Sequence, residues 1–163
     1  MLDLRPRILS VGTANPPNRY RQSDLLEMFK VEDPRIRSIF TASHIKTRHL
    51  YLPEAGPDGK PKVETQGQLL KKHRAGCKQV APQAIQRCLE PMGLAVTDID
   101  YLVCITSTGW LTPGLTAILI KECGFRPDVQ RMDIVGMGCN AGLNGLNPVA
   151  SWAMANPGKN ALM

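Results

Sequence analysis

The stretch MDIVGMGCNAGLNGLN, residues 132 to 147, decides the fold class of this chain. It opens with apolar, partly β-branched residues, as a buried strand does, and this run stops at glycines. A cysteine follows, and small residues and asparagines continue as far as Asn156-Pro157-Gly158, which would end a helix. We therefore predict a strand over MDIVGMG, a helix from Cys139 onward, and a thiol at the junction between the two.

The segment before this stretch has the same order of strand and helix. YLVCITST, residues 101 to 108, is a continuous run of strand-forming residues, which is typical of a strand buried on both faces. Thr112-Pro113 predicts the start of a helix, and Gly124 predicts its end. Alternating strands and helices indicate an α/β protein in which a sheet is layered with helices.

Shorter elements are predicted in the first ninety residues. They are a buried strand over 7–14, a helix from Ser23 to Phe29, a helix opened by Asp33-Pro34, a partly exposed strand over 44–52, a surface loop over 53–62 and a helix over 66–90. Pro82 lies inside the last of these helices and predicts a kink, because proline has no N–H to donate. Cys77 and Cys88 fall on the apolar stripe of the same helix and are expected to pack in the core.

The composition is that of a globular protein and argues against several classes. Hydrophobic residues make up 43% and no apolar run is long enough to cross a membrane, so we expect no membrane partner. The N-terminus does not look like a secretory signal, and the five cysteines form no CxxC pair, which favours free thiols in the cytoplasm. The formal net charge is +6, but Lys and Arg are scattered and aromatic residues are only 5%. This pattern suits an anionic substrate such as a coenzyme A thioester better than nucleic acid.

Cys139 is the candidate nucleophile. As the first residue of a helix, its sulfur would lie beside unpaired N–H groups and the positive end of the helix dipole, which favour the thiolate. Gly136 and Gly138 allow a sharp turn and a close approach of substrate, and the Cys139 amide is placed to donate to a thioester oxygen under attack. These features suit a cysteine that becomes acylated. The alternative is a small buried hydrophobic residue at a strand-helix junction, and the spacing alone leaves both open.

A cysteine nucleophile needs a basic partner, and the residues offer no convincing one. His44 and His49 flank the partly exposed strand, and His73 lies among the basic residues 71–74. All three are therefore predicted to be surface histidines. No metal-binding spacing links them to the cysteines, so no metal is expected.

Three segments resemble the type III polyketide synthases, the chalcone synthase-like branch of the thiolase superfamily. They are ILSVGTANPPNRYRQSDLL, YLVCITSTGWLTPGLTA and GFRPDVQRMDIVGMGCNAGLNGLN. The resemblance covers essentially all of residues 1–163 and implies the N-terminal half of a layered, thiolase-like (αβαβα) fold, with the C-terminal half outside this chain. It further implies decarboxylative condensation of malonyl-CoA units in a homodimer, with coenzyme A thioesters as substrates and no cofactor.

The resemblance also assigns roles to individual residues. Cys139 matches the acylated nucleophile, and Thr112 matches the place where plant relatives carry a residue that crosses into the partner subunit. A substrate pocket beside the thiol is expected from Thr106, Ser107, Thr108, Thr112, Met137 and Gly138. For residues 106–108 the alternative is ordinary strand chemistry, since threonine suits strands.

Two departures from the family pattern stand out. Plant relatives hold coenzyme A phosphates with three basic residues, and the matching positions here are Arg35, Ser38 and Ala42. Only Arg35 remains as a coenzyme A contact, with help from Arg37, and the alternative is plain surface charge. In addition, the family's catalytic histidine and asparagine come from its C-terminal half, so residues 1–163 alone are expected to be inactive.

Within the family, VEDPRIRSIF and IVGMGCNAGLN are most similar to the bacterial branch that forms 3,5-dihydroxyphenylacetyl-CoA, for the dihydroxyphenylglycine of glycopeptide antibiotics. That product is the leading expectation. Two alternatives stay open: a related synthase that loads another acyl-CoA starter on Cys139, and a truncated, non-catalytic fragment that only binds partners. Residues 159–163 look like the start of a further strand, which suggests a longer protein.

Overall fold

The computed structural model describes residues 5–57 and 59–163 and divides the chain into two compact units. The larger unit holds the residues up to Ala14 and His73–Met163, and the smaller one holds Asn15–Lys72. The prediction that no secretory signal is present rests partly on residues 1–4, which lie outside the described residues, as does Asp58 of the predicted surface loop.

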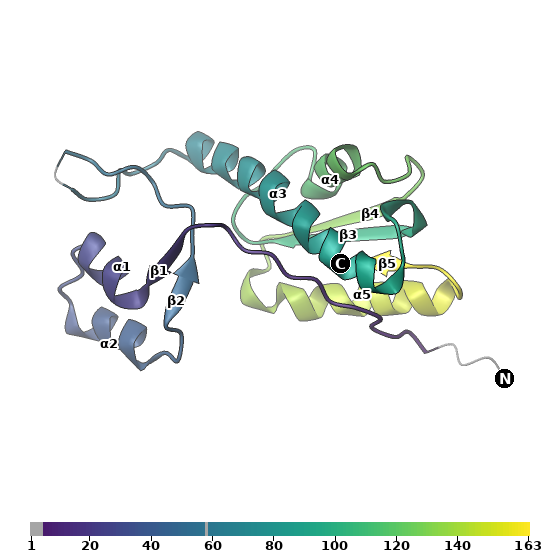
Figure 1. Cartoon of the computed structure of the whole chain (residues 1–163), viewed down its shortest axis with the longest axis horizontal. Coiled ribbons are helices and arrows are strands. Elements are labelled where there is room, and N and C mark those ends of the chain that lie inside the picture. The colour runs from purple at the N-terminus through teal and green to yellow at the C-terminus, as the bar shows by residue number, and fades with distance from the viewer. Residues whose placement is uncertain (1–4, 58) are drawn as a thin grey trace. The chain divides into compact units, whose positions relative to one another are not determined.

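A parallel three-stranded sheet forms the centre of the larger unit (Figure 1). Its order is β4 (Gln130–Val135), β3 (Tyr101–Thr106) and β5 (Ala161–Leu162), with β3 in the middle. Thr106 at the end of β3 lies opposite Val135 at the end of β4. Both predicted strands are confirmed, although β4 begins two residues earlier than expected and ends before the glycines.

Helices cover both faces of this sheet (Figure 1). One face packs against α4 (Leu115–Cys123) and the C-terminal part of α3 (Gln66–Leu89), through a core of Ile85, Leu89, Ile99, Leu102, Leu119, Phe125 and Val129. The thiols of Cys77, Cys104 and Cys123 pack against this core. Short 3-10 turns η1 (Glu90–Met92) and η2 (Val96–Asp98) connect α3 to β3. The predicted α/β layering is therefore present, and Pro82 lies inside α3 as expected.

The opposite face of the sheet packs against α5 (Ala141–Ala155). A Cβ added to Gly145 would lie 2.2 Å from Ile105 Cδ1, so this glycine lets α5 approach β3 closely. The rings of Trp152 and Tyr101 are 4.9 Å apart at their centroids. Ala141 and Gly145 are the buried residues of α5, whereas Leu143 is 75% exposed.

The predicted buried strand over residues 7–14 is wrong. The segment runs extended without joining a sheet, and Ile8 and Val11 are 78% and 75% exposed. It packs instead along α3, where a Cβ on Gly12 would lie 2.1 Å from the Ala84 carbonyl oxygen. Arg87 also donates a hydrogen bond of 2.8 Å to the Thr13 carbonyl. A strand-forming run needs a neighbouring strand, and the described residues supply a helix in that place.

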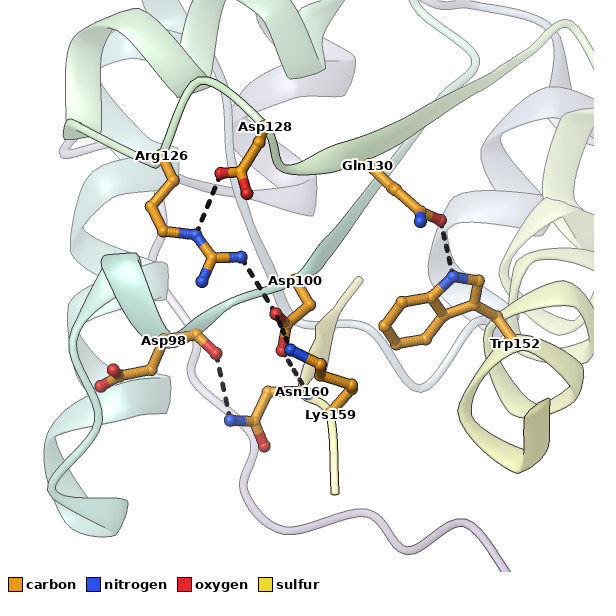
Figure 2. A network of polar contacts seen from close by, with 8 residues as sticks. All are labelled: Asp98, Asp100, Arg126, Asp128, Gln130, Trp152, Lys159 and Asn160. Carbon is orange, nitrogen blue, oxygen red and sulfur yellow. Dashed lines mark hydrogen bonds and ion pairs between the residues drawn. The ribbon is translucent and has the colours of Figure 1, made fainter. Parts of the chain in front are cut away.

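Asp100 forms hydrogen bonds with residues at the amino ends of the three strands (Figure 2). Its carboxylate accepts hydrogen bonds from the Asn160 amide at 3.1 Å, from Arg126 Nη2 at 3.0 Å and from Lys159 Nζ at 3.2 Å. Asp100 precedes β3, Arg126 precedes β4, and the other two partners precede β5. The backbone bond from Asn160, followed by the bonds from the two cations, lowers the pKa of the Asp100 carboxyl.

The smaller unit contains two helices and a two-stranded antiparallel sheet. These are α1 (Gln22–Met28), α2 (Pro34–Ala42), β1 (Arg19–Arg21) and β2 (Thr47–His49). The Asp33 carboxylate caps α2 as predicted, accepting from the Arg35 amide at 2.7 Å. Ser23 is the predicted cap of α1, but the N-cap is Arg21, two residues earlier, and the Asp24 carboxylate accepts the Arg21 amide at 3.3 Å.

The buried side chain of Gln22 joins the elements of the smaller unit. Its Oε1 accepts from Arg48 Nε at 2.7 Å, and its Nε2 donates to the Phe40 carbonyl at 3.3 Å and to Ser43 Oγ at 3.2 Å. Helices α1 and α2 and strand β2 are thereby tied to one amide.

Among the residues that the structure describes, no helix combines the length and hydropathy that crossing a membrane requires.

Candidate active site

Cys139 lies in the single 3-10 turn η3 (Gly138–Asn140) between β4 and α5. The prediction that it is the first residue of the helix is therefore wrong by two residues, because Asn140 is the N-cap of α5. The expected sharp turn is confirmed: Gly136 and Gly138 have φ angles of 81° and 70°, which favour glycine. Cys139 is exposed, whereas the other four cysteines are half-buried.

The four remaining cysteines are structural, and burial separates three of them chemically from Cys139. Burial raises the pKa of Cys104 to about 12, with Asp133 and the neighbouring thiols adding to the effect. Burial also raises the pKa of Cys77 and Cys123. Because the thiolate is the nucleophile, these core thiols are poor candidates for acylation. The buried-hydrophobe alternative for Cys139 does not fit its exposure.

The loop after β3 touches the turn after β4. A Cβ added to Gly136 would lie 3.1 Å from Trp110 Cζ2, so this glycine leaves room for the indole ring. Trp110 is 74% exposed, and Met137, which follows Gly136 in the turn after β4, is exposed as well. The carboxyl ends of neighbouring parallel strands thus bring the two predicted pocket segments to one edge of the sheet.

The polar residues at the end of β3 form a connected group. Thr106 is half-buried as the last residue of the strand, and Ser107 and Thr108 follow it exposed. Thr106 Oγ1 accepts from the Thr108 amide at 3.3 Å and lies 3.3 Å from Thr108 Oγ1. The strand therefore ends in two adjacent hydroxyls at the edge that carries Cys139.

His73 joins this group, and its prediction as a surface histidine is wrong. It is half-buried on α3, with Nδ1 2.9 Å from Thr108 Oγ1 and Nε2 3.5 Å from Thr106 Oγ1. Burial lowers the pKa of His73, which favours the neutral ring. The signal was available in the sequence: His73 stands four residues before Cys77 and so continues the apolar stripe of the helix.

Asp133 is a second polar residue near this site that no pattern in the sequence indicates. Its carboxylate accepts the Thr116 amide at 3.0 Å and also the Thr116 hydroxyl, so a strand residue of β4 caps α4. Gly114 leaves room for this carboxylate, because a Cβ at that position would lie only 2.4 Å from Asp133 Cγ. The predicted start of the helix at Thr112-Pro113 is therefore two residues early, since α4 begins at Leu115 with Gly114 as its N-cap.

The remaining predicted site residues are exposed. Thr112 precedes α4 on the loop after β3, and its peptide bond to Pro113 is cis. Arg35 and Arg37 lie on α2 of the smaller unit, where Arg37 Nη1 donates to the Val31 carbonyl at 2.8 Å. Their contact with coenzyme A stays a prediction. Within residues 5–57 and 59–163, no three His, Cys, Asp or Glu side chains gather as a metal site would require.

Comparison with known proteins gives a consistent result along almost the whole chain. Residues 5–163 match the profile of a family described as chalcone and stilbene synthases, N-terminal domain. The 3,5-dihydroxyphenylacetyl-CoA synthase of Amycolatopsis balhimycina is 48% identical over 153 residues, which is 94% of this chain and 41% of that protein. The synthase of the same name from Streptomyces toyocaensis is 46% identical over 159 residues, covering 98% of this chain and 41% of its own length.

A solved structure shares the fold as well. The crystal structure of PKS-I from the brown alga Ectocarpus siliculosus superposes with a TM-score of 0.86 at 30% identity. It covers 98% of this chain and 47% of its own. The chain thus spans about two fifths of the length of the curated relatives it matches.

Proposed function

Since this chain belongs to the chalcone and stilbene synthases as their N-terminal domain, we propose that it carries the nucleophile of a type III polyketide synthase. One observation supports this most. Cys139 is the exposed thiol among five, and it lies at the carboxyl end of a parallel sheet behind two glycines with positive φ. A thiol in that place is open to a bulky thioester.

The reaction proposed for Cys139 is acyl transfer followed by decarboxylative condensation. The thiolate attacks the thioester carbonyl of malonyl-CoA, the bond from that carbon to the coenzyme A sulfur breaks, and the coenzyme A thiolate leaves and takes up a proton. A second malonyl-CoA loses CO₂, and the enolate carbon that remains attacks the acyl carbonyl. The new carbon–carbon bond expels the Cys139 thiolate, which is then free to be acylated again.

We propose 3,5-dihydroxyphenylacetyl-CoA as the product, with malonyl units serving as both starter and extender. The support is 46–48% identity to synthases of that name. The tetraketide would cyclise and aromatise within the same protein. A related synthase that uses another acyl-CoA starter is the second candidate, because pocket residues outside this chain would choose the starter.

Three further parts of the proposal concern the surroundings of the site. Arg35 is exposed on α2 and is the proposed coenzyme A contact, while Arg37 is already engaged by the Val31 carbonyl. The exposed Thr112 is proposed to face a partner subunit in a homodimer, and the free thiols suit the cytoplasm. Residues 1–163 alone are proposed to be inactive, since the resemblance takes the catalytic histidine and asparagine from a second half.

The deciding experiment is product analysis by mass spectrometry on the complete synthase supplied with malonyl-CoA alone. Cys139→Ala should abolish the dihydroxyphenylacetyl product and the acylated enzyme. Cys123→Ala is the matched control, because that thiol packs half-buried against the core, and it should retain the product.

Each other outcome counts against a defined part of the proposal. Turnover only after a different acyl-CoA is added would favour the second candidate. Full activity in Cys139→Ala would remove this thiol from the mechanism. Neither product nor acylated enzyme from any acyl-CoA would favour a non-catalytic protein.

A further inference from the structure

We propose that His73 is a positioning residue of this site, which orients the hydroxyls of Thr106 and Thr108 so that one of them donates to the acyl carbonyl held at Cys139. The inference rests on the proposed function and adds a residue to it. The three side chains come from α3 and from the end of β3.

Hydrogen-bond counting supports this role. A neutral imidazole has one N–H donor and one acceptor nitrogen, and the two ring nitrogens of His73 face different hydroxyls, at 2.9 and 3.5 Å. In either tautomer, the ring accepts the proton of one threonine and donates its own N–H to the oxygen of the other. The proton of the second threonine is then shared only with the oxygen of the first, at the long distance of 3.3 Å, until a substrate oxygen replaces that contact. One hydroxyl donor after β3 can therefore turn from this weak contact to a substrate oxygen.

The rest of the group limits where that proton can go. Thr106 Oγ1 already accepts the Thr108 amide at 3.3 Å, so one of its lone pairs is occupied. Half-burial of Thr106 and His73 protects their contact from water, while Thr108 is open. Burial also favours the neutral ring, which the count requires. A hydroxyl so constrained is pre-oriented for a substrate oxygen, as a donor to a developing negative charge must be.

The location of the group connects it with the thiol. Thr106 lies opposite Val135 in the β3–β4 ladder, and the β4 turn that carries Cys139 begins at the next residue. The loops beyond both strands touch through Trp110 and Gly136. The hydroxyls and the thiol therefore belong to the same edge of the sheet.

The first test compares two replacements of His73 in the complete enzyme. His73→Leu fills the space without polar atoms, and we expect kcat to fall about tenfold with the KM for malonyl-CoA little changed, as for the loss of one hydrogen bond in the transition state. His73→Gln keeps one acceptor and one donor on a side chain of similar reach, and should recover most of the rate. His44→Leu, at an exposed histidine of the smaller unit, is the control and should be neutral.

The test also includes Thr106 and Thr108. If the hydroxyls carry the effect, His73→Leu should change the rate by less than twofold once Thr106 and Thr108 are both valine. Equal rates for His73→Leu and the wild type would overturn the inference while leaving the proposed function intact. The inference would also be overturned if His73→Gln were as slow as His73→Leu while both variants unfolded at the wild-type temperature.

A spectroscopic measurement tests the positioning without turnover. With ¹⁵N-labelled histidine in the complete protein, the His73 ring should be neutral and held in one tautomer, and Thr108→Val should mix the two tautomers. A charged ring, or an even mixture in the wild type, would overturn the inference. Absence of any product from the wild type would count against the proposed function, and the ring nitrogens would then decide the positioning on their own.

Discussion

At the scale of single residues, the surroundings of each cysteine separate one thiol from the others. Cys139 lies exposed in a 3-10 turn, whereas Cys77, Cys104 and Cys123 pack against the core between two helices and the sheet. Burial in that core raises the pKa of Cys104 to about 12. Cysteine therefore fills space in the core at three positions and is a candidate nucleophile at the exposed Cys139.

Alkylation should follow this difference. With limiting iodoacetamide near neutral pH, we expect Cys139 to be labelled first and Cys104 last, because Cys139 is exposed while burial raises the pKa of Cys104. Mass spectrometry of the tryptic peptides measures the order. Cys139→Ala should remove the fast phase, and a fast phase that persists in this variant would show that another thiol is the reactive one.

Gly136 is the residue whose backbone shapes the turn before the thiol. Its φ of 81° and the indole of Trp110 at 3.1 Å both oppose a side chain. Gly136→Ala should lower the free energy of unfolding by about 1–2 kcal/mol, the cost of a left-handed non-glycine residue. Denaturant unfolding measures it. Gly142→Ala, with open space and helical backbone, is the matched control and should be neutral or slightly stabilising.

At the scale of elements, helix α4 is anchored from outside itself. Its N-cap is Gly114, which has no side chain to offer, and the Asp133 carboxylate of β4 supplies the missing acceptor to the Thr116 amide at 3.0 Å. Thr116 is fully buried, and Arg131 Nη1 donates to its hydroxyl at 3.2 Å. A strand thus fixes the start of the helix that follows the Thr112 loop.

Removal of this cap should destabilise the larger unit. Asp133→Ala leaves the buried Thr116 amide without its acceptor, so we expect a loss of about 1–2 kcal/mol in the free energy of unfolding. Urea unfolding followed by circular dichroism gives the value, and Glu32→Ala, at an exposed carboxylate of the smaller unit, serves as control. Equal losses in the two variants would mean that the cap contributes nothing of its own.

At the scale of the whole molecule, the two edges of the parallel sheet serve different purposes. The amino edge carries a network of ion pairs and hydrogen bonds in which Asp100 joins the starts of all three strands (Figure 2). The carboxyl edge carries Cys139, the threonines and His73, with short turns and exposed side chains. Ionic contacts thus join the amino ends of the strands, and the candidate chemistry lies at their carboxyl ends.

The network at the amino edge predicts a pH dependence of stability. The pKa of Asp100 is lowered in the folded state, so its contribution is present above its ordinary pKa of 3.8 and is lost as the pH falls through the folded value. Asp100→Asn should therefore cost about 2 kcal/mol at pH 7, as for the loss of charge-assisted hydrogen bonds, and progressively less below pH 3.8.

Thermal unfolding of both proteins across this range is the measurement. Asp128→Asn, at a carboxylate that is 75% exposed, should have a small effect at every pH. A cost for Asp100→Asn that does not change with pH would contradict the linkage.

Local pattern determined much of this protein from the sequence alone. Runs such as YLVCITST and the turn residues around Asp33-Pro34 and Gly124 located β3, α2 and the end of α4, and the thiol after the glycines pointed to the site. The reason is physical: periodicity, capping and positive φ act over a few residues, so they can be read without knowledge of the fold.

Only the tertiary structure decided which distant residues meet. Residues 7–14 have a strand-forming composition, but the neighbour they find is α3, and a strand cannot exist without a partner. The contacts of His73 with Thr108 and of Asp133 with Thr116 depend on how helices cross over between parallel strands, which no local pattern encodes. The thiol could thus be found in the sequence, whereas its polar neighbours could be found only once β3, β4 and α3 were assembled.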